Sequence, residues 1–189
     1  MGFLIEEAQP VIWRGPMLNS IIRQFLYQVE WNNLDFLVVD LPPGTGDAQI
    51  SLAQSVPISG AIVVTTPQQV SLQDARRGLA MFKQLNVPLL GVIENMSVFI
   101  PPDMPNKRYE IFGKGGGKIL AAENNLPLLA QIPIEIKLVN ECNKGIPISI
   151  SEPNKVSSIR FAELANLIKK QFLNCLLYTS PSPRDSVGS

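Results

Sequence analysis

Short apolar runs alternate with segments of helical periodicity along most of the chain. Each run is continuous, as expected for a strand that is buried on both faces of a parallel sheet. Strands that alternate with helices indicate an α/β fold with a mostly parallel sheet flanked by helices. The predicted strands are residues 36–39, 60–66, 89–95 and 128–132, and the predicted helices are residues 17–30, 71–85, 118–124, 135–142 and 153–172.

The composition excludes several kinds of chemistry. The 189 residues include no histidine, so histidine-based catalysis and histidine-ligated zinc are excluded within this chain. The two cysteines, Cys142 and Cys175, are too few for a disulfide framework or for the four ligands of a metal cluster. Lys plus Arg and Asp plus Glu number 16 each, which gives no electrostatic reason to expect a nucleic-acid or membrane partner. We therefore expect a reduced, cytoplasmic protein.

The strongest chemical signal is an acidic residue after the first apolar run, followed by a Pro-Pro-Gly-Thr-Gly-Asp loop. If this run is a buried strand, Asp40 lies at its carboxyl end, where parallel α/β sheets bind ligands. In P-loop nucleotide hydrolases an Asp in this position orients Mg²⁺, usually through water. Gly44 and Gly46 would leave backbone N–H groups accessible to a γ-phosphate, and Asp47 would orient a water or a partner subunit. The alternative is a strand-ending Asp before a tight turn.

Several motifs stand together in the order found in one family. They are residues 11–17 (VIWRGPM), 40–47 (DLPPGTGD), 65–68 (TTPQ), 74–78 (DARRG), 91–97 (GVIENMS), 111–117 (IFGKGGG) and 145–148 (GIPI). Over about residues 1–172 the chain resembles the iron–sulfur carrier ATPases of the Mrp/ApbC type, in the MinD/ParA-like branch of the P-loop NTPases.

The resemblance implies a homodimer that binds ATP and Mg²⁺, with Asp40 orienting the metal through water. It also implies that Asn95 contacts the adenine ring and that Pro133 belongs to a loop flanking the base. An Asn side chain offers both a donor and an acceptor to an adenine edge. Without the resemblance, Asn95 is equally explained as a cap of the turn at a strand end. Arg14, Arg76 and Arg77 could contact phosphate or a partner, or lie solvated on the surface.

One departure from the family concerns the phosphate-binding loop. The family carries a Gly-Lys-Gly-Gly-Val-Gly-Lys-Ser/Thr loop upstream of the position of Trp13, and no such loop precedes Met1. We therefore expect residues 1–173 to be the C-terminal portion of a P-loop NTPase domain, without its first strand and P-loop. The full protein would be an ATP hydrolase, whereas this portion alone would be inactive. Residues 113–118 resemble the missing loop only superficially, because Ile119 stands where Ser or Thr is needed, and they are predicted to form a flexible turn.

A second departure concerns the cluster ligands. Many family members carry a Cys-x-x-Cys pair after the Met-Ser strand end, and two subunits share a 4Fe–4S cluster between their pairs. Here residues 97–109 contain no cysteine, and their Pro-Pro-Asp variant resembles a cyanobacterial and plastid subgroup. A plastid stroma is therefore an alternative location. Cys142 is the remaining candidate cluster ligand, although a lone cysteine is also explained as a small buried apolar residue.

Residues 174–189 differ in character from the rest of the chain. They are rich in Ser, Pro and Gly and show no periodic pattern, which predicts a disordered tail. Residues 175–185 can be back-translated into the transposase adapter used in short-read DNA libraries. We interpret this tail as read-through into adapter sequence, so Cys175 carries no functional weight.

Three functions are compatible with these observations. The first is an ATP-dependent carrier or scaffold that binds iron–sulfur clusters and transfers them to apo iron–sulfur proteins. The second is a positioning ATPase of the MinD/ParA kind, which would require a basic membrane-binding or nucleoid-binding surface. The third is a nucleotide-switched adaptor that holds no cluster. The weakly basic end of the 153–172 helix and the Pro-Pro-Gly-Thr-Gly-Asp loop favour the first.

Overall fold

The computed structural model describes residues 15–41, 46–104 and 106–179, without the side chains of residues 15–19, 47, 48 and 173–179. It confirms the α/β fold class. The elements in chain order are α1 (Gly15–Tyr27), α2 (Asp47–Ser55), β1 (Ala61–Thr65), α3 (Gln69–Gln84), β2 (Leu89–Phe99), α4 (Gly116–Glu123), β3 (Leu128–Ile134), α5 (Ile136–Asn143), α6 (Ile148–Ser151) and α7 (Val156–Thr179).

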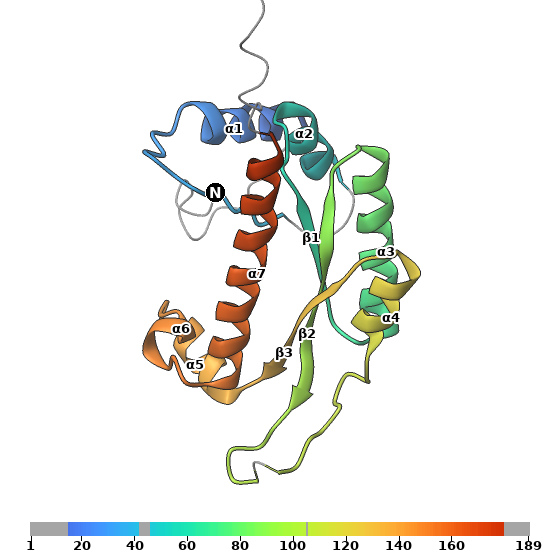
Figure 1. Cartoon of the computed structure of the whole chain (residues 1–189), viewed down its shortest axis with the longest axis vertical. Coiled ribbons are helices and arrows are strands. Elements are labelled where there is room, and N and C mark those ends of the chain that lie inside the picture. Colours follow the sequence, from blue (N-terminus) through green and yellow to red (C-terminus); the bar gives the residue numbers. More distant parts are fainter. Residues whose placement is uncertain (1–14, 42–45, 105, 180–189) are drawn as a thin grey trace, which may run out of the picture.

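The described strands form one parallel sheet in the order β1-β2-β3. Val63 pairs with Val92, and Ile93 pairs with Ala130, so β2 is the central strand. The carboxyl ends of β2 and β3 lie in the lower part of the molecule in Figure 1, and β3 leads into α5. Polar groups that follow these strands therefore gather at one edge of the sheet, as ligand sites in parallel α/β folds require.

Helices cover both faces of this sheet. Figure 1 shows α3 and α4 on one side of the strands and α7 on the other. Between the strands and the first pair of helices lies an apolar core in which Leu72, Leu79, Val92 and Leu120 are almost fully buried. A second cluster around Phe82 joins the end of α3 to the start of β1. Burial of these side chains fixes the strands that carry the candidate site.

The predicted strand at residues 36–39 is wrong. These residues form no strand, and Val38 is 90% exposed. A strand needs a neighbour for its backbone N–H and C=O groups, and no described segment pairs with residues 36–39. The ring of Phe36 instead meets that of Phe172 on α7 edge-on, with centroids 5.8 Å apart.

Other differences concern the ends and the number of elements. β2 and β3 run beyond the predicted ends at residues 95 and 132, and the helices α2 and α6 were not predicted. α7 continues to Thr179, so residues 174–179 are helical rather than the start of an irregular tail. Residues 180–189 lie outside the described chain, and their interpretation as adapter sequence stays a prediction. No helix in the described part of the chain is long and apolar enough to cross a membrane.

Candidate functional site

The candidate site lies where β2 and β3 approach their carboxyl ends. Asn95 of β2 pairs with Ile132 of β3, and the next pair along the strands is Phe99 with Ile134. Three residues of β2, 96–98, therefore face the single residue Pro133, which makes a β-bulge. Bulges re-aim side chains beside ligand sites in many proteins. The two residues predicted to contact a nucleobase, Asn95 and Pro133, thus lie on adjacent strands beside this bulge.

Backbone strain accompanies the bulge. Met96 has a φ of 54°, the left-handed region that non-glycine residues rarely adopt. Its N–H donates to the side-chain Oδ1 of Asn95 at 2.9 Å. With the oxygen engaged in this way, the Nδ2 group is the part of the Asn95 amide left to donate to a ligand. Ser97 then ties the bulge to β3, because its hydroxyl donates to the carbonyl of Ile132 at 3.2 Å.

Pro133 is buried within β3 and does not lie in a loop, which corrects the sequence expectation. β3 is an edge strand of the described sheet, which is where proline is tolerated. Proline has no N–H to donate to the ladder, so a bulge opposite Pro133 leaves no donor of that residue unpaired. The missing N–H of Pro133 therefore suits the bulge that lies opposite it.

Glu94, one residue before Asn95, was not identified from the sequence. Its side chain is 1% exposed. The Oε2 atom accepts from the backbone N–H of Gly117 at 2.6 Å, and Oε1 accepts from Nε2 of Gln131 at 2.7 Å. A charged residue inside the apolar run 89–95 was the available signal, because a carboxylate is buried only where hydrogen bonds compensate it.

Close packing explains the glycines at the start of α4. A Cβ atom on Gly117 would lie 2.8 Å from Cβ of Glu94, and one on Gly116 would lie 2.5 Å from the carbonyl oxygen of Pro67. The amide at this helix end donates to the carboxylate of Glu94, which occupies the place an anion would take. Gly116 and Gly117 are thus a tightly packed start of α4 rather than part of a phosphate-binding loop, and Gly113 and Gly115 belong to the turn before it.

Asp40 and Gly46 lie outside the two strands that carry Asn95 and Pro133. Asp40 lies in the exposed segment after residues 36–39, so it does not end a strand as predicted. Gly46 precedes α2 with a φ of −81°, a conformation that any residue adopts. Gly44 lies outside the described residues, and Asp47 begins α2 without a described side chain. Of the predicted site residues that the structure describes, Asn95 and Pro133 lie on neighbouring strands, and Asp40 is an exposed carboxylate outside the sheet.

Cys142 lies exposed on α5 as a free cysteine, not buried. In the part of the chain that the structure describes, no group of three or more Cys, His, Asp or Glu side chains could hold a metal ion. The loop that replaces the family's cysteine pair is closed by two backbone hydrogen bonds of 2.9 Å between Phe99 and Tyr109. The role of Cys142 in cluster binding stays a prediction.

Two of the three candidate arginines form ion pairs on the surface. Arg76 on α3 binds Glu123 on α4 with an N–O distance of 3.0 Å, and Arg77 binds Asp74 at 3.1 Å. Arg14 lies outside the described residues. Both described arginines therefore have partners within the chain, as the surface interpretation predicted.

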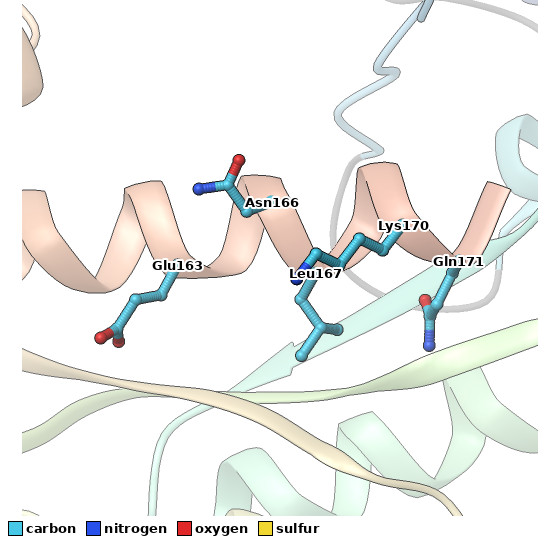
Figure 2. Close-up of a pocket in the computed structure, with 5 residues that line it drawn as sticks. All are labelled: Glu163, Asn166, Leu167, Lys170 and Gln171. Carbon is cyan, nitrogen blue, oxygen red and sulfur yellow. The ribbon is translucent and has the colours of Figure 1, made fainter. Parts of the chain in front are cut away.

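A separate hollow of about 440 Å³ lies along α7. Figure 2 shows Leu167 and Gln171 directed toward the strands and Asn166 directed away from them. One helix supplies all the lining residues, Glu163, Asn166, Leu167, Lys170 and Gln171. None of these is a predicted site residue, so this hollow is distinct from the bulge between β2 and β3.

Known proteins resemble this chain in both sequence and structure. The chain is 60% identical to the "Iron-sulfur cluster carrier protein" of Synechocystis sp. over 168 residues, 89% of this chain and 48% of the relative. It is 43% identical to the mouse "Iron-sulfur cluster transfer protein NUBPL" over 171 residues, 90% of this chain and 53% of the relative. The chain thus spans about half the length of these curated relatives.

Two solved structures share the fold. A nucleotide-binding protein from Archaeoglobus fulgidus, solved in complex with ADP, matches with a TM-score of 0.61 and 35% identity, over 68% of this chain and 53% of that one. The cell division ATPase MinD from Pyrococcus furiosus matches with a TM-score of 0.59 over 86% of this chain and 63% of that one. Its identity is 22%, so this second likeness shows the fold alone.

The family profile described as "ParA: NUBPL iron-transfer P-loop NTPase" matches residues 1–169, nearly the whole described chain and the residues of the candidate site. The relatives, the parallel sheet and the motifs agree with this match. The chain belongs to the ParA/NUBPL family of iron-transfer P-loop NTPases.

Proposed function

We propose that the protein containing this chain is an ATP-dependent iron–sulfur cluster carrier that delivers clusters to apo iron–sulfur proteins. The observation that carries the proposal is the 60% identity to a cluster carrier across 89% of this chain. The base side of a nucleotide site, Asn95 beside Pro133, supports the coupling to nucleotide. The cluster is the cargo of this protein.

ATP and Mg²⁺ are the proposed cofactors. The free Nδ2 group of Asn95 suits a nucleobase, because it can donate to a ring nitrogen of adenine. For the metal, Asp40 is exposed and available, and Gly44, Gly46 and Asp47 follow it in sequence. In this proposal Asp40 orients Mg²⁺ through water, the glycines contact the γ-phosphate, and Asp47 orients water or a partner subunit.

The remaining features of the proposal concern assembly and location. The protein would act as a homodimer, in which ATP hydrolysis or nucleotide exchange shifts the subunits and so controls cluster release. Its location would be the cytoplasm, or the plastid stroma in a photosynthetic eukaryote. Measuring the molecular mass of the full-length protein in solution, with and without ATP, tests the dimer. Fractionation of the source cells tests the location.

The second candidate is a nucleotide-switched adaptor without a cluster. Two observations favour it: residues 97–109 contain no cysteine, and Cys142 lies exposed outside any group of potential ligands in the described chain. The two candidates share the nucleotide site and differ only in the cargo. One experiment therefore separates them.

The experiment is anaerobic reconstitution of the full-length protein with iron and sulfide, followed by transfer to an apo ferredoxin. The carrier predicts visible absorbance from a bound cluster and faster transfer with ATP than without it. Asp40→Asn should remove the ATP effect, whereas Asp74→Asn, which alters an exposed carboxylate on α3, should not. A full-length protein that acquires no iron contradicts the carrier and supports the adaptor.

A further inference from the structure

We propose that Glu94 is a positioning residue for nucleobase recognition, because its buried carboxylate fixes β2 against β3 and α4 immediately before the bulge that carries Asn95. This inference rests on the proposed nucleotide site. It assigns a role to a buried charged group that neither the motif analysis nor the proposed mechanism uses.

A side-chain contact of Glu94 holds the register of β2 against β3. Glu94 and Gln131 are Cα partners on β2 and β3, and their side chains are joined at 2.7 Å. The following pair is Asn95 with Ile132, after which the register shifts. A strand next to a bulge can slip in register unless specific side-chain contacts hold it. The link between Glu94 and Gln131 therefore keeps Asn95 next to Pro133.

Glu94 is also anchored on α4. The other carboxylate oxygen of Glu94 accepts from the N–H of Gly117 at 2.6 Å, at the amino-terminal end of α4. A helix amino terminus stabilises a negative charge, and a charge-assisted hydrogen bond is stronger than a neutral one. Figure 1 shows α4 beside the strands on the face that also carries α3. Glu94 thus connects the strand that carries Asn95 to the helical layer.

Few other contacts can replace the hydrogen bonds of the Glu94 carboxylate. Glu94 is 1% exposed, so water cannot readily substitute for a lost acceptor. In the described chain, no Lys or Arg forms an ion pair with Glu94, so its compensation comes from these two hydrogen bonds and the helix end. Removing the carboxylate leaves the buried Gly117 N–H without its acceptor and breaks the side-chain link to Gln131, a residue that is itself exposed.

The position of Asn95 matters because a hydrogen bond to a base forms only when the donor points at the acceptor. Its oxygen is engaged by the N–H of Met96, so the Nδ2 group is directed by the backbone of the bulge. Adenine carries an acceptor at N1 where guanine carries a donor, so a fixed Nδ2 donor favours ATP over GTP. If the bulge can shift, this donor loses its fixed direction and the preference falls.

The test measures the dissociation constants of ATP and of GTP for the full-length protein and its variants. Glu94→Met keeps the length of the side chain but removes both acceptors, and should lower the preference for ATP by about tenfold. Glu94→Gln should recover most of it, because the new amide can accept from Gly117 and donate to a reoriented Gln131. Rescue by Glu94→Gln would show that the hydrogen bonds of this side chain, and not only its volume, maintain the preference for ATP.

Leu120→Ala is the matched control. Leu120 is fully buried on α4 but takes no part in the hydrogen bonds of Glu94, so its loss should lower stability without changing the ATP-to-GTP ratio. If Leu120→Ala lowers the ratio as much as Glu94→Met does, the role of Glu94 is only structural and the inference is overturned. If Glu94→Met does not fold, Gln131→Met removes one donor and should lower the ratio about threefold.

The outcomes distinguish this inference from the function on which it rests. A wild-type protein that binds neither nucleotide contradicts the proposed function, and the inference falls with it. A wild-type protein that binds both nucleotides equally, or variants at positions 94 and 131 with an unchanged ratio, overturn the inference alone. A selective fall in ATP preference, with rescue by Glu94→Gln, supports it.

Discussion

At the residue scale, some positions require glycine because a larger side chain would collide with a neighbour, and not because of an unusual φ angle. Gly117 is fixed by the side chain of Glu94, whereas Gly78 in the middle of α3 has nothing within 4 Å of the place its Cβ would take. The same substitution should therefore have opposite effects at these two positions. The sequence showed a glycine-rich segment near residue 115, but it could not show which glycines touch a neighbour.

The first prediction uses this contrast. Gly117→Ala should destabilise the full-length protein by about 1–3 kcal/mol, because the new methyl group overlaps Glu94. Gly78→Ala should stabilise it by roughly 0.5–1 kcal/mol, because alanine loses less entropy in a helix. Urea unfolding of both variants measures the difference. Equal effects of the two substitutions would contradict the packing described for the start of α4.

The second prediction concerns pH. The Lys144 ammonium, which hydrogen-bonds Glu141 at 3.0 Å, lowers the pKa of that carboxyl below its ordinary value of 4.5. A depressed pKa in the folded state means that Glu141 contributes stability above pH 4.5, and that this contribution is lost as pH falls through the folded-state pKa.

Glu141→Gln should therefore flatten the decrease in stability between neutral and acidic pH, and Lys144→Met should do so in part. Urea unfolding of the full-length protein at a series of pH values measures this slope. An unchanged slope in Glu141→Gln would show that the group has the same pKa in the folded and unfolded states.

At the element scale, helical periodicity predicted the helices α1, α3, α4, α5 and α7, and continuous apolar runs predicted the strands β1, β2 and β3. It failed for residues 36–39, where an apolar run has no neighbouring strand in the described chain. It also missed Glu94, since the partners Gly117 and Gln131 are distant in sequence. Burial depends on what lies beside an element, and a local pattern does not contain that information.

The third prediction compares two links between α3 and α4. Leu120→Ala should cost about 2–5 kcal/mol of stability, because a large buried side chain is lost and a cavity remains. Arg76→Ala should cost less than about 1 kcal/mol, because its ion pair with Glu123 is 40% and 45% exposed. Urea unfolding measures both. A larger loss for Arg76→Ala would mean that the exposed ion pair, rather than the core, holds the two helices.

The fourth prediction concerns residues 36–39. Their backbone takes part in no sheet, so the amide protons of Leu37, Val38 and Val39 should exchange with solvent far faster than those of Val92 and Ile93 in β2. Hydrogen exchange on the 189-residue chain measures this difference. Slow exchange at residues 37–39 would mean that the apolar run forms a strand after all, as its sequence pattern indicates. The same measurement on the full-length protein would show whether a longer chain supplies the neighbour.

At the scale of the whole molecule, the parallel sheet places Asn95 and Pro133, the residues proposed to contact the base, at one end. Asn95 and Pro133 meet there because β2 and β3 run in the same direction and stay in register up to the bulge. Asp40 and Gly46, proposed for Mg²⁺ and phosphate, lie outside these strands. The family resemblance named Asn95 and Pro133 as candidates, and their role stays a prediction. The structure adds the bulge, the buried carboxylate and its hydrogen bond to α4.

The proposed nucleotide site requires that the carboxyl ends of β2 and β3 hold the base of ATP. The measurement that tests it most directly is titration of ATP with Mg²⁺ into the full-length protein and its Asn95→Ala variant, with Asn166→Ala on α7 as the control. Asn95→Ala should weaken ATP binding about tenfold, as expected for a lost directional hydrogen bond. Asn166→Ala should bind ATP as the wild type does. Equal affinity of the wild type and Asn95→Ala would contradict the proposed nucleotide site.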